Sequence, residues 1–176
     1  MIIREIKPAD YPVLEDFLYH AYDNTPSGEN ALNSRDEIFE PDIYEQIKDF
    51  GVESDCGVVA EQDGLIVGAA WTRMLPNDEF PAYNDITDLT ISVLPKYRGK
   101  NIGTKIMKKL FELLIERGYE KTLLHVNAKN PAFRLYKRLG YEITDSYMDH
   151  IDNDVYEEVY IMVKDLIAKT DCINVT

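Results

Sequence analysis

The chain has 176 residues, enough for one domain with a sizeable core, and its hydrophobic content of 45% excludes overall disorder. No apolar run approaches the roughly 20 residues of a membrane span, and the two cysteines suit neither a disulfide framework nor a zinc site, so we expect a reduced cytoplasmic protein without a metal. The net charge is −13, yet residues 96–138 carry 12 Lys/Arg against 3 Asp/Glu, and the remainder carries 7 against 29. This distribution favours a polyanionic ligand in one region and a cationic one elsewhere, and it disfavours nucleic acid.

The first half of the chain predicts two helices and a hairpin. The opening residues read as a strand rather than a signal peptide, and apolar residues at helical spacing follow from Val13 to Ala21. Asp63-Gly64 is a strong hairpin turn signal. In chain order we expect a strand at Ile2–Ile6, a helix from Pro8, a polar loop over Asn24–Asn33, a helix over Pro41–Phe50 stopped by Gly51, and strands at Gly57–Glu61 and Leu65–Arg73.

The central stretch, DLTISVLPKYRGKNIG (Asp88 to Gly103), predicts a strand, a basic loop and a helix start. After the breaker-rich loop Pro76–Tyr83, a strand runs over Asp85–Val93, Pro95 stops it, and a helix begins near Gly103 and ends at Gly118. Glycines and a helix N-terminus direct backbone N–H groups towards an anion, so a phosphate-bearing ligand is the functional interpretation. The alternative is a plain strand-to-helix turn. The pattern matches neither a Walker loop nor a dinucleotide-binding loop.

The last third predicts a parallel crossover followed by a second hairpin. We expect a strand at Thr122–Val126, a short helix over Pro131–Leu139 ending at Gly140, strands at Tyr141–Tyr147 and Tyr156–Val163 around an acidic turn Asp149–Asp154, and a tail. The sequence of elements is that of an α/β protein, with one domain over residues 1–166 and a tail over 167–176.

Two motifs resemble those of the GNAT N-acetyltransferase superfamily. The loop is similar to its acetyl-CoA pyrophosphate pattern [RQ]-x-x-G-x-[GA], with Arg98 and Gly103 matching the ends and Asn101 in place of the first glycine. Asn is the non-glycine residue that best tolerates positive φ. The segment from Asn130 to Tyr141 resembles N-x-x-A-x-x-L-Y-x-x-x-G-[FY], with one residue fewer between Asn and Ala. The resemblance implies the GNAT fold, a mixed and mainly antiparallel sheet of about seven strands with helices on both faces.

The same resemblance implies where acetyl-CoA binds and which residue protonates the leaving thiolate. The cofactor-binding residues would be Ile91, Ser92, Val93, Arg98, Gly99, Lys100, Asn101, Ile102, Gly103, Thr104 and Asn130. The family's oxyanion donor is a backbone N–H on the strand before the loop, and Val93 falls there, with Ile91 and Ser92 beside it. Tyr136 would be the general acid. The alternative reading is that Tyr136 is a core residue with a hydrated hydroxyl.

The general base has several candidates. In the ribosomal-protein N-terminal acetyltransferases, which this chain also resembles around Tyr147 and Glu157–Met162, a Glu stands five residues before the motif Asn. His125 takes that place here, and an imidazole with a pKa of about 6.5 suits the role. The alternatives are a hydrogen-bonded strand histidine, a water chain, or one of the carboxylates Glu79, Asp85 and Asp88.

The expected acceptor is a small-molecule or peptide amine. Acidic residues before and within the central strand, in the last turn and around Asp36–Asp42 favour a cationic primary amine, and Tyr44, Tyr83 and Tyr147 would line its passage. A non-catalytic CoA-binding or regulatory module on the same fold is the alternative function. A homodimer stands beside a monomer as an open alternative.

Overall fold

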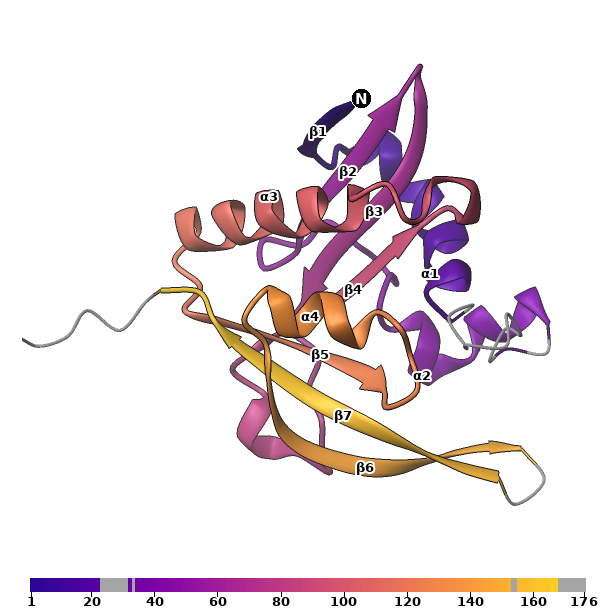
Figure 1. The fold of residues 1–176 in the computed structure, drawn as a ribbon, viewed down its shortest axis with the longest axis vertical. Helices are drawn as coiled ribbons and strands as arrows, with labels where there is room; N and C mark the ends of the chain where they lie inside the picture. The colour runs from indigo at the N-terminus through magenta and orange to yellow at the C-terminus, as the bar shows by residue number, and fades with distance from the viewer. Residues whose placement is uncertain (23–31, 33, 153–154, 168–176) are drawn as a thin grey trace, which may run out of the picture.

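The strands of the computed structural model form one mixed sheet, and the model describes residues 1–22, 32, 34–152 and 155–167. Its elements are β1 (Ile2–Glu5), η1 (Pro8–Val13), α1 (Leu14–Tyr22), η2 (Arg35–Phe39), α2 (Pro41–Tyr44), β2 (Cys56–Gln62), β3 (Leu65–Arg73), η3 (Pro81–Tyr83), β4 (Thr87–Val93), η4 (Pro95–Tyr97), α3 (Ile102–Glu116), β5 (Lys121–Asn127), α4 (Phe133–Arg138), β6 (Glu142–Asp152) and β7 (Val155–Asp165). The strand order is β1-β2-β3-β4-β5-β7-β6, and every neighbouring pair is antiparallel except β4 with β5 (Figure 1). This confirms the predicted mixed, mainly antiparallel sheet.

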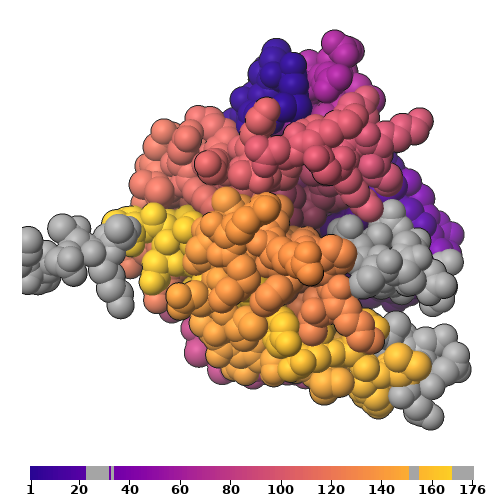
Figure 2. Space-filling view, in the orientation of Figure 1, coloured from indigo at the N-terminus to yellow at the C-terminus, as the bar shows by residue number. Residues whose placement is uncertain are grey.

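Helices cover both faces of the sheet, as predicted. Successive side chains of a strand point to opposite faces, and β2 supplies Val58 to one core and Val59 to the other. The first core packs under α3, whose apolar residues recur every three or four positions, and α3 and α4 cover the same face (Figure 2). The second core packs under α1, with Leu14, Phe17 and Leu18 buried against it.

The predicted turn of the first hairpin is confirmed in detail. Asp63 has φ +54° and Gly64 has φ +80°, the pair of positive values that a two-residue turn between β2 and β3 requires. Gly68, in β3, is needed for a close approach. A Cβ there would come within 2.7 Å of the Ile106 side chain, so α3 rests directly on the β3 backbone.

The predicted helix over Pro41–Phe50 is wrong in its length, because α2 ends at Tyr44. The carbonyl groups that a longer helix would use are bonded to side chains of β3. Trp71 Nε1 donates to Gln46 O at 2.9 Å, and Arg73 Nη1 donates to Glu45 O and Lys48 O at 2.8 and 2.5 Å. The chain therefore continues in tight turns, and Ile47 is still buried as predicted.

The second hairpin is longer than predicted. Cross-strand pairing continues through Asp149–Glu157 and His150–Tyr156, so most of the predicted acidic turn belongs to β6. The His150 and Tyr156 rings pack in a tilted arrangement, with centroids 5.0 Å apart and an interplanar angle of 51°. Residues 153–154 of that turn, the predicted loop Asn24–Asn33 apart from Leu32, and residues 168–176 of the predicted tail lie outside the described residues.

Candidate functional site

The sheet opens between its two parallel strands. β4 and β5 have seven residues each, but only Thr87–Thr122 and Asp88–Leu123 pair, and the strands then diverge (Figure 1). Leu94 N–H donates to Val67 O at 3.0 Å on the β3 side. Because bonding directions alternate along an antiparallel ladder, the N–H groups of Ile91 and Val93 point away from β3 and into the gap, whereas that of Ser92 points to β3.

A left-handed basic loop joins the end of β4 to α3. Gly99 has φ +72° and Asn101 has φ +63°, which confirms that Asn101 takes the positive φ expected of a glycine. The helix start has no capping bond from the Asn101 side chain, so the first-turn N–H groups of Ile102, Gly103 and Thr104 are not capped by it. Such an N-terminus, beside exposed Lys100 and Lys105, favours an anion.

One hydrogen bond and one approach of the helix start hold this loop against the sheet. Arg98 Nε donates to Val93 O at 2.9 Å, so the guanidinium folds back onto the strand end. A Cβ at Gly103 would lie 3.4 Å from Leu135 and 3.9 Å from Ile91, in ordinary contact with α4 and β4. The first turn of α3 therefore sits over the gap at the junction of three elements.

α4 carries Tyr136 on the α3 side of the sheet. Asn130 Oδ1 accepts the Ala132 N–H at 2.8 Å in the turn before α4, whose N-cap residue is Ala132, and Gly140 follows the helix with φ +89°. Tyr136 is buried, with its ring 6.1 Å from that of Tyr141. Burial raises the pKa of the Tyr136 phenol to about 12, so it is protonated at neutral pH.

The other face of the gap carries a polar cluster from three strands. His125 Nε2 of β5 lies 3.5 Å from Asp88 Oδ2 of β4, and His125 Nδ1 lies 3.2 Å from the Tyr147 hydroxyl of β6. The side chains of His125 and Asp88 are 27% and 22% exposed. Burial raises the pKa of Asp88 to about 7, against a smaller lowering by the Leu89 N–H, and burial lowers the pKa of His125.

Aromatic and acidic side chains surround this cluster. The Phe80 ring lies 5.7 Å from that of Tyr147, and Gln46 Nε2 donates to the Tyr22 hydroxyl at 2.8 Å. Burial raises the pKa of Tyr147, and the charges of Asp149, Asp88 and Glu79 raise it further. These acids come from β6, β4 and the loop before η3, so the field around the Tyr147 hydroxyl is negative.

The sequence-predicted residues thus fall on two sides of one gap. One group follows β4 into the start of α3 and consists of Ile91, Val93 and residues 98–104. Tyr136 lies on the face of the sheet that α3 covers. His125 lies on the opposite face, which α1 covers. Ser92 is apart from the group along β4, because its N–H faces β3 and its side chain is buried. Sequence reasoning named Asp88 and His125 separately but not their contact, nor Tyr147 as a partner of His125. Only the alternation along β4, β5 and β6 would have placed them on one face.

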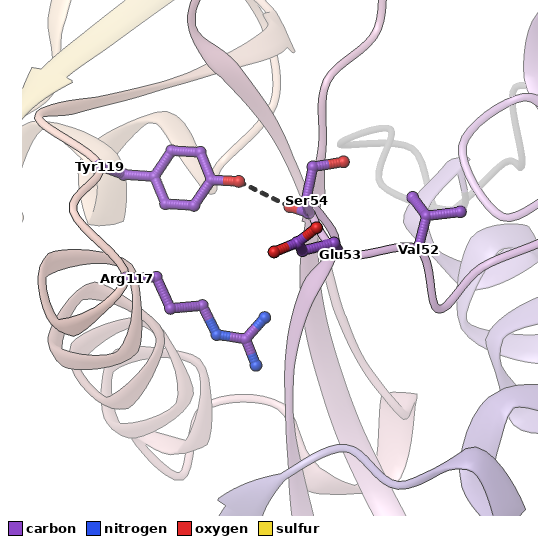
Figure 3. A pocket seen from close by; sticks show the side chains of 5 residues that line it. All are labelled: Val52, Glu53, Ser54, Arg117 and Tyr119. Carbon is purple, nitrogen blue, oxygen red and sulfur yellow. Dashed lines mark hydrogen bonds between the residues drawn. The ribbon is translucent and has the colours of Figure 1, made fainter.

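A hollow elsewhere is not part of this arrangement. It is lined by Val52, Glu53, Ser54, Arg117 and Tyr119 (Figure 3). Tyr119 donates to Ser54 O at 2.8 Å and Arg117 to Asp55 O at 2.9 Å, bonds that fasten the C-terminal end of α3 to the loop before β2. The basic loop lies at the N-terminal end of α3, about 22 Å away for a helix of 15 residues.

The described helices include none long and apolar enough to cross a membrane. Among the described residues no group of three or more His, Cys, Asp and Glu side chains is arranged to hold a metal ion.

Comparison with protein families gives one model match. The acetyltransferase (GNAT) family model matches residues 15–141. A mycothiol acetyltransferase from Corynebacterium aurimucosum is 28% identical over 83 residues, which cover 47% of this chain and 26% of that relative. The chain therefore spans about a quarter of the length of the curated relative that it matches.

Comparison with solved structures extends over nearly the whole chain. A ribosomal-protein-alanine N-acetyltransferase from Brucella melitensis has a TM-score of 0.69 at 22% identity, covering 94% of this chain and 99% of that one. The yncA protein of Salmonella typhimurium, solved with its cofactor acetyl-CoA, has a TM-score of 0.67 at 20% identity, covering 95% and 94%. At these identities the likeness shows a shared fold.

Proposed function

Since the chain belongs to the acetyltransferase (GNAT) family, we propose that it moves an acetyl group from acetyl-CoA to a primary amine by direct transfer in a ternary complex. The observation that carries this proposal is the gap between β4 and β5, which leads from inward-directed backbone N–H groups to a helix N-terminus that the Asn101 side chain does not cap.

The gap and the loop fit the two chemically different parts of acetyl-CoA. The amide-containing arm needs strand-like hydrogen-bonding partners, which Ile91 and Val93 offer. The diphosphate needs N–H donors and positive charge, which the loop offers. We assign this role to Arg98, Gly99, Lys100, Asn101, Ile102, Gly103 and Thr104, with Asn130 at the border of the same gap.

The residues flanking the gap can carry out the transfer. The amine nitrogen attacks the thioester carbonyl, and a backbone N–H in the gap stabilises the oxyanion. Ile91 and Val93 are the two candidate donors, and Val93 holds the position that the resemblance implies for this role. As the carbon–sulfur bond breaks, Tyr136 gives its proton to the thiolate.

The Asp88–His125 pair receives the proton of the acceptor amine. Asp85 and Glu79 are exposed, whereas Asp88 and His125 contact one another beside the gap. A non-catalytic CoA-binding module would need the loop but would not need this pair or Tyr136, and their retention supports an enzyme.

The acceptor that fits this site is a cationic primary amine. The acidic residues Glu79, Asp88 and Asp149 lie around Tyr147, and their negative charges attract and orient an ammonium group. Tyr22 lies in the field of two of the same acids. An amino acid that presents its carboxylate here would be repelled.

Calorimetry with CoA and a thiol-release assay over a panel of amines test the proposal. We expect CoA binding, and thiol release with at least one cationic amine. Arg98→Glu replaces a cation by an anion beside the diphosphate and should raise the Kd for CoA about 10- to 100-fold, equivalent to the loss of a charged hydrogen bond. Lys121→Glu, the same reversal at the start of β5, is the matched control and should leave the Kd unchanged.

Two results would count against the proposal. Absence of CoA binding at millimolar concentration would reduce the loop to a structural turn. Binding without thiol release from any amine would favour the non-catalytic module.

A further inference from the structure

Both ring nitrogens of His125 have partners on other strands. Asp88 Oδ2 lies 3.5 Å from Nε2 and the Tyr147 hydroxyl lies 3.2 Å from Nδ1. β7 separates β5 from β6 in the sheet, so Tyr147 reaches across a whole strand to make its contact. The two rings meet edge to face, with centroids 5.8 Å apart and an interplanar angle of 66°.

The chemistry of the three groups sets which of them donates and which accepts a hydrogen. An ionised carboxylate accepts hydrogen bonds and donates none, so opposite ionised Asp88 the hydrogen of neutral His125 must lie on Nε2. Nδ1 is then an acceptor, and Tyr147, whose phenol keeps its proton because burial raises its pKa, donates to it. The Tyr147 hydroxyl thus donates to His125, and the Nε2–H of His125 faces Asp88 Oδ2 at 3.5 Å.

This arrangement leaves one group able to take a proton from a substrate. Both nitrogens of His125 are engaged, whereas a carboxylate has about four lone-pair sites and keeps capacity beyond the one facing His125. Resting on the proposed acetyl transfer, we propose that Asp88 accepts the proton of the acceptor amine and that Tyr147 and His125 are positioning residues that hold Asp88 in its proton-accepting state.

The proton balance is closed. The ammonium group loses one proton to Asp88, and the resulting amine forms the nitrogen–carbon bond. The nitrogen then loses a second proton, which replaces the one that Tyr136 gave to the departing thiolate. The products are the acetylated amine, the CoA thiol and one proton, released to solvent when Asp88 ionises again.

The surroundings favour titration of Asp88 in the neutral range. Among the described residues, the titratable groups that interact electrostatically with Asp88 or Tyr147 include Tyr22 from α1, Glu79 from the loop before η3, Tyr141 after α4 and Asp149 from β6. No cation is among these groups, and burial brings the pKa of the Asp88 carboxyl to about 7. A base is most effective when its pKa is near the working pH.

Variants of the two positioning residues separate this proposal from a role of His125 as the base. His125→Gln keeps an Nε2–H donor towards Asp88 and should retain kcat/KM within about tenfold, whereas His125→Leu lacks the donor. Tyr147→Phe keeps the ring against Phe80 but removes the donor to His125 Nδ1. The hydrogen of the imidazole can then move to Nδ1, which leaves a lone pair on Nε2 facing Asp88 and favours the protonated form of Asp88.

The readout is the pH profile of kcat/KM. In the wild type we expect it to rise with pH and to level off above about 7, the pKa of Asp88. Tyr147→Phe and His125→Leu should move the rising limb of this pH profile to higher pH, with the Kd for CoA and the Tm unchanged. Asp88→Asn should remove the limb and lower kcat by about 10²- to 10⁴-fold. Tyr156→Phe, an exposed tyrosine of β7, is the control and should match the wild type.

Two outcomes overturn the proposal. If His125→Gln loses as much activity as Asp88→Asn, His125 is the base. If Tyr147→Phe reproduces the wild-type profile, Tyr147 only packs. Carbon NMR titration of the Asp88 carboxyl in wild type and Tyr147→Phe reads the same effect without turnover. An unchanged pKa of the Asp88 carboxyl would refute the positioning role of Tyr147, even in a protein that acetylates no amine. The absence of amine acetylation would count separately, against the proposed function.

Discussion

Tyr136 illustrates how burial tunes a single side chain. A phenol in water and a thiol have similar acidities, and burial raises the pKa of Tyr136 to about 12. The residue is therefore fully protonated at neutral pH, and it does not compete with thioester chemistry as a nucleophile. The neutral phenol is the protonation state that a donor to the departing thiolate requires.

Tyr136→Phe should lower kcat about 10²- to 10⁴-fold and leave the Kd for CoA and the Tm close to wild type, because only the proton donor is lost. Stopped-flow thiol release, calorimetry and thermal unfolding measure the three quantities. Tyr141→Phe removes a hydroxyl from the neighbouring ring and serves as control. An unaltered kcat in Tyr136→Phe would make this residue part of the core.

Single residues were predictable from sequence where the reason is local. Asn101 takes positive φ because its short side chain tolerates it, and the Asn130 oxygen accepts from an N–H two residues on, a local contact typical of Asn in turns. The His125 contacts were not predictable, since they join residues 37 and 22 positions away through a sheet order that local patterns leave open.

At the scale of elements, hydrophobic periodicity predicted every strand and the long helix α3, but not the length of α2. The pattern of Ile43, Tyr44 and Ile47 is helical, and the burial it predicts is present. The helix stops because Trp71 and Arg73, about 25 residues away, take its carbonyl groups. Such competition from a distant strand has no local signature.

The start of α3 offers a test of the left-handed loop. Asn101→Val should lower the free energy of unfolding by about 1–2 kcal/mol, because a branched side chain strains this conformation, whereas Asn101→Gly should not. The corresponding loss in Tm is about 2–8 °C, measurable by calorimetry. Lys100→Val, next to it and without a positive φ, is the control. Equal Tm values for both valine variants would show that the strain is absent in solution.

The charge of the whole molecule is unevenly distributed along the sequence. In the proposed reaction the excess of cations in residues 96–138 attracts the polyanionic cofactor, and the excess of acids elsewhere attracts the acceptor. The sequence predicted this division, because composition needs no knowledge of the fold. It could not predict which acids gather at Tyr147.

The acidic residues around Tyr147 predict a salt-dependent preference for acceptors of higher positive charge. We expect kcat/KM for a diamine to exceed that for the matched monoamine at an ionic strength of about 0.01 M, where the Debye length is about 30 Å. The preference should fade near 1 M, where that length is about 3 Å. A monoamine preferred at both ionic strengths would restrict the acidic surface to a role in solubility.

The short parallel pairing has a mechanical consequence. Strands β1–β4 and strands β5–β7 form two parts of the sheet, here called plates, which two residue pairs join. We expect the sheet to bend more easily at these two pairs, here called the hinge, than inside either plate. Bending about this hinge changes the width of the gap while the ladders inside each plate stay intact. Asp88 belongs to one plate and His125 to the other, so their contact spans the hinge. An occupant bonded to both plates would stiffen the hinge and fix the spacing across which these two residues share a proton.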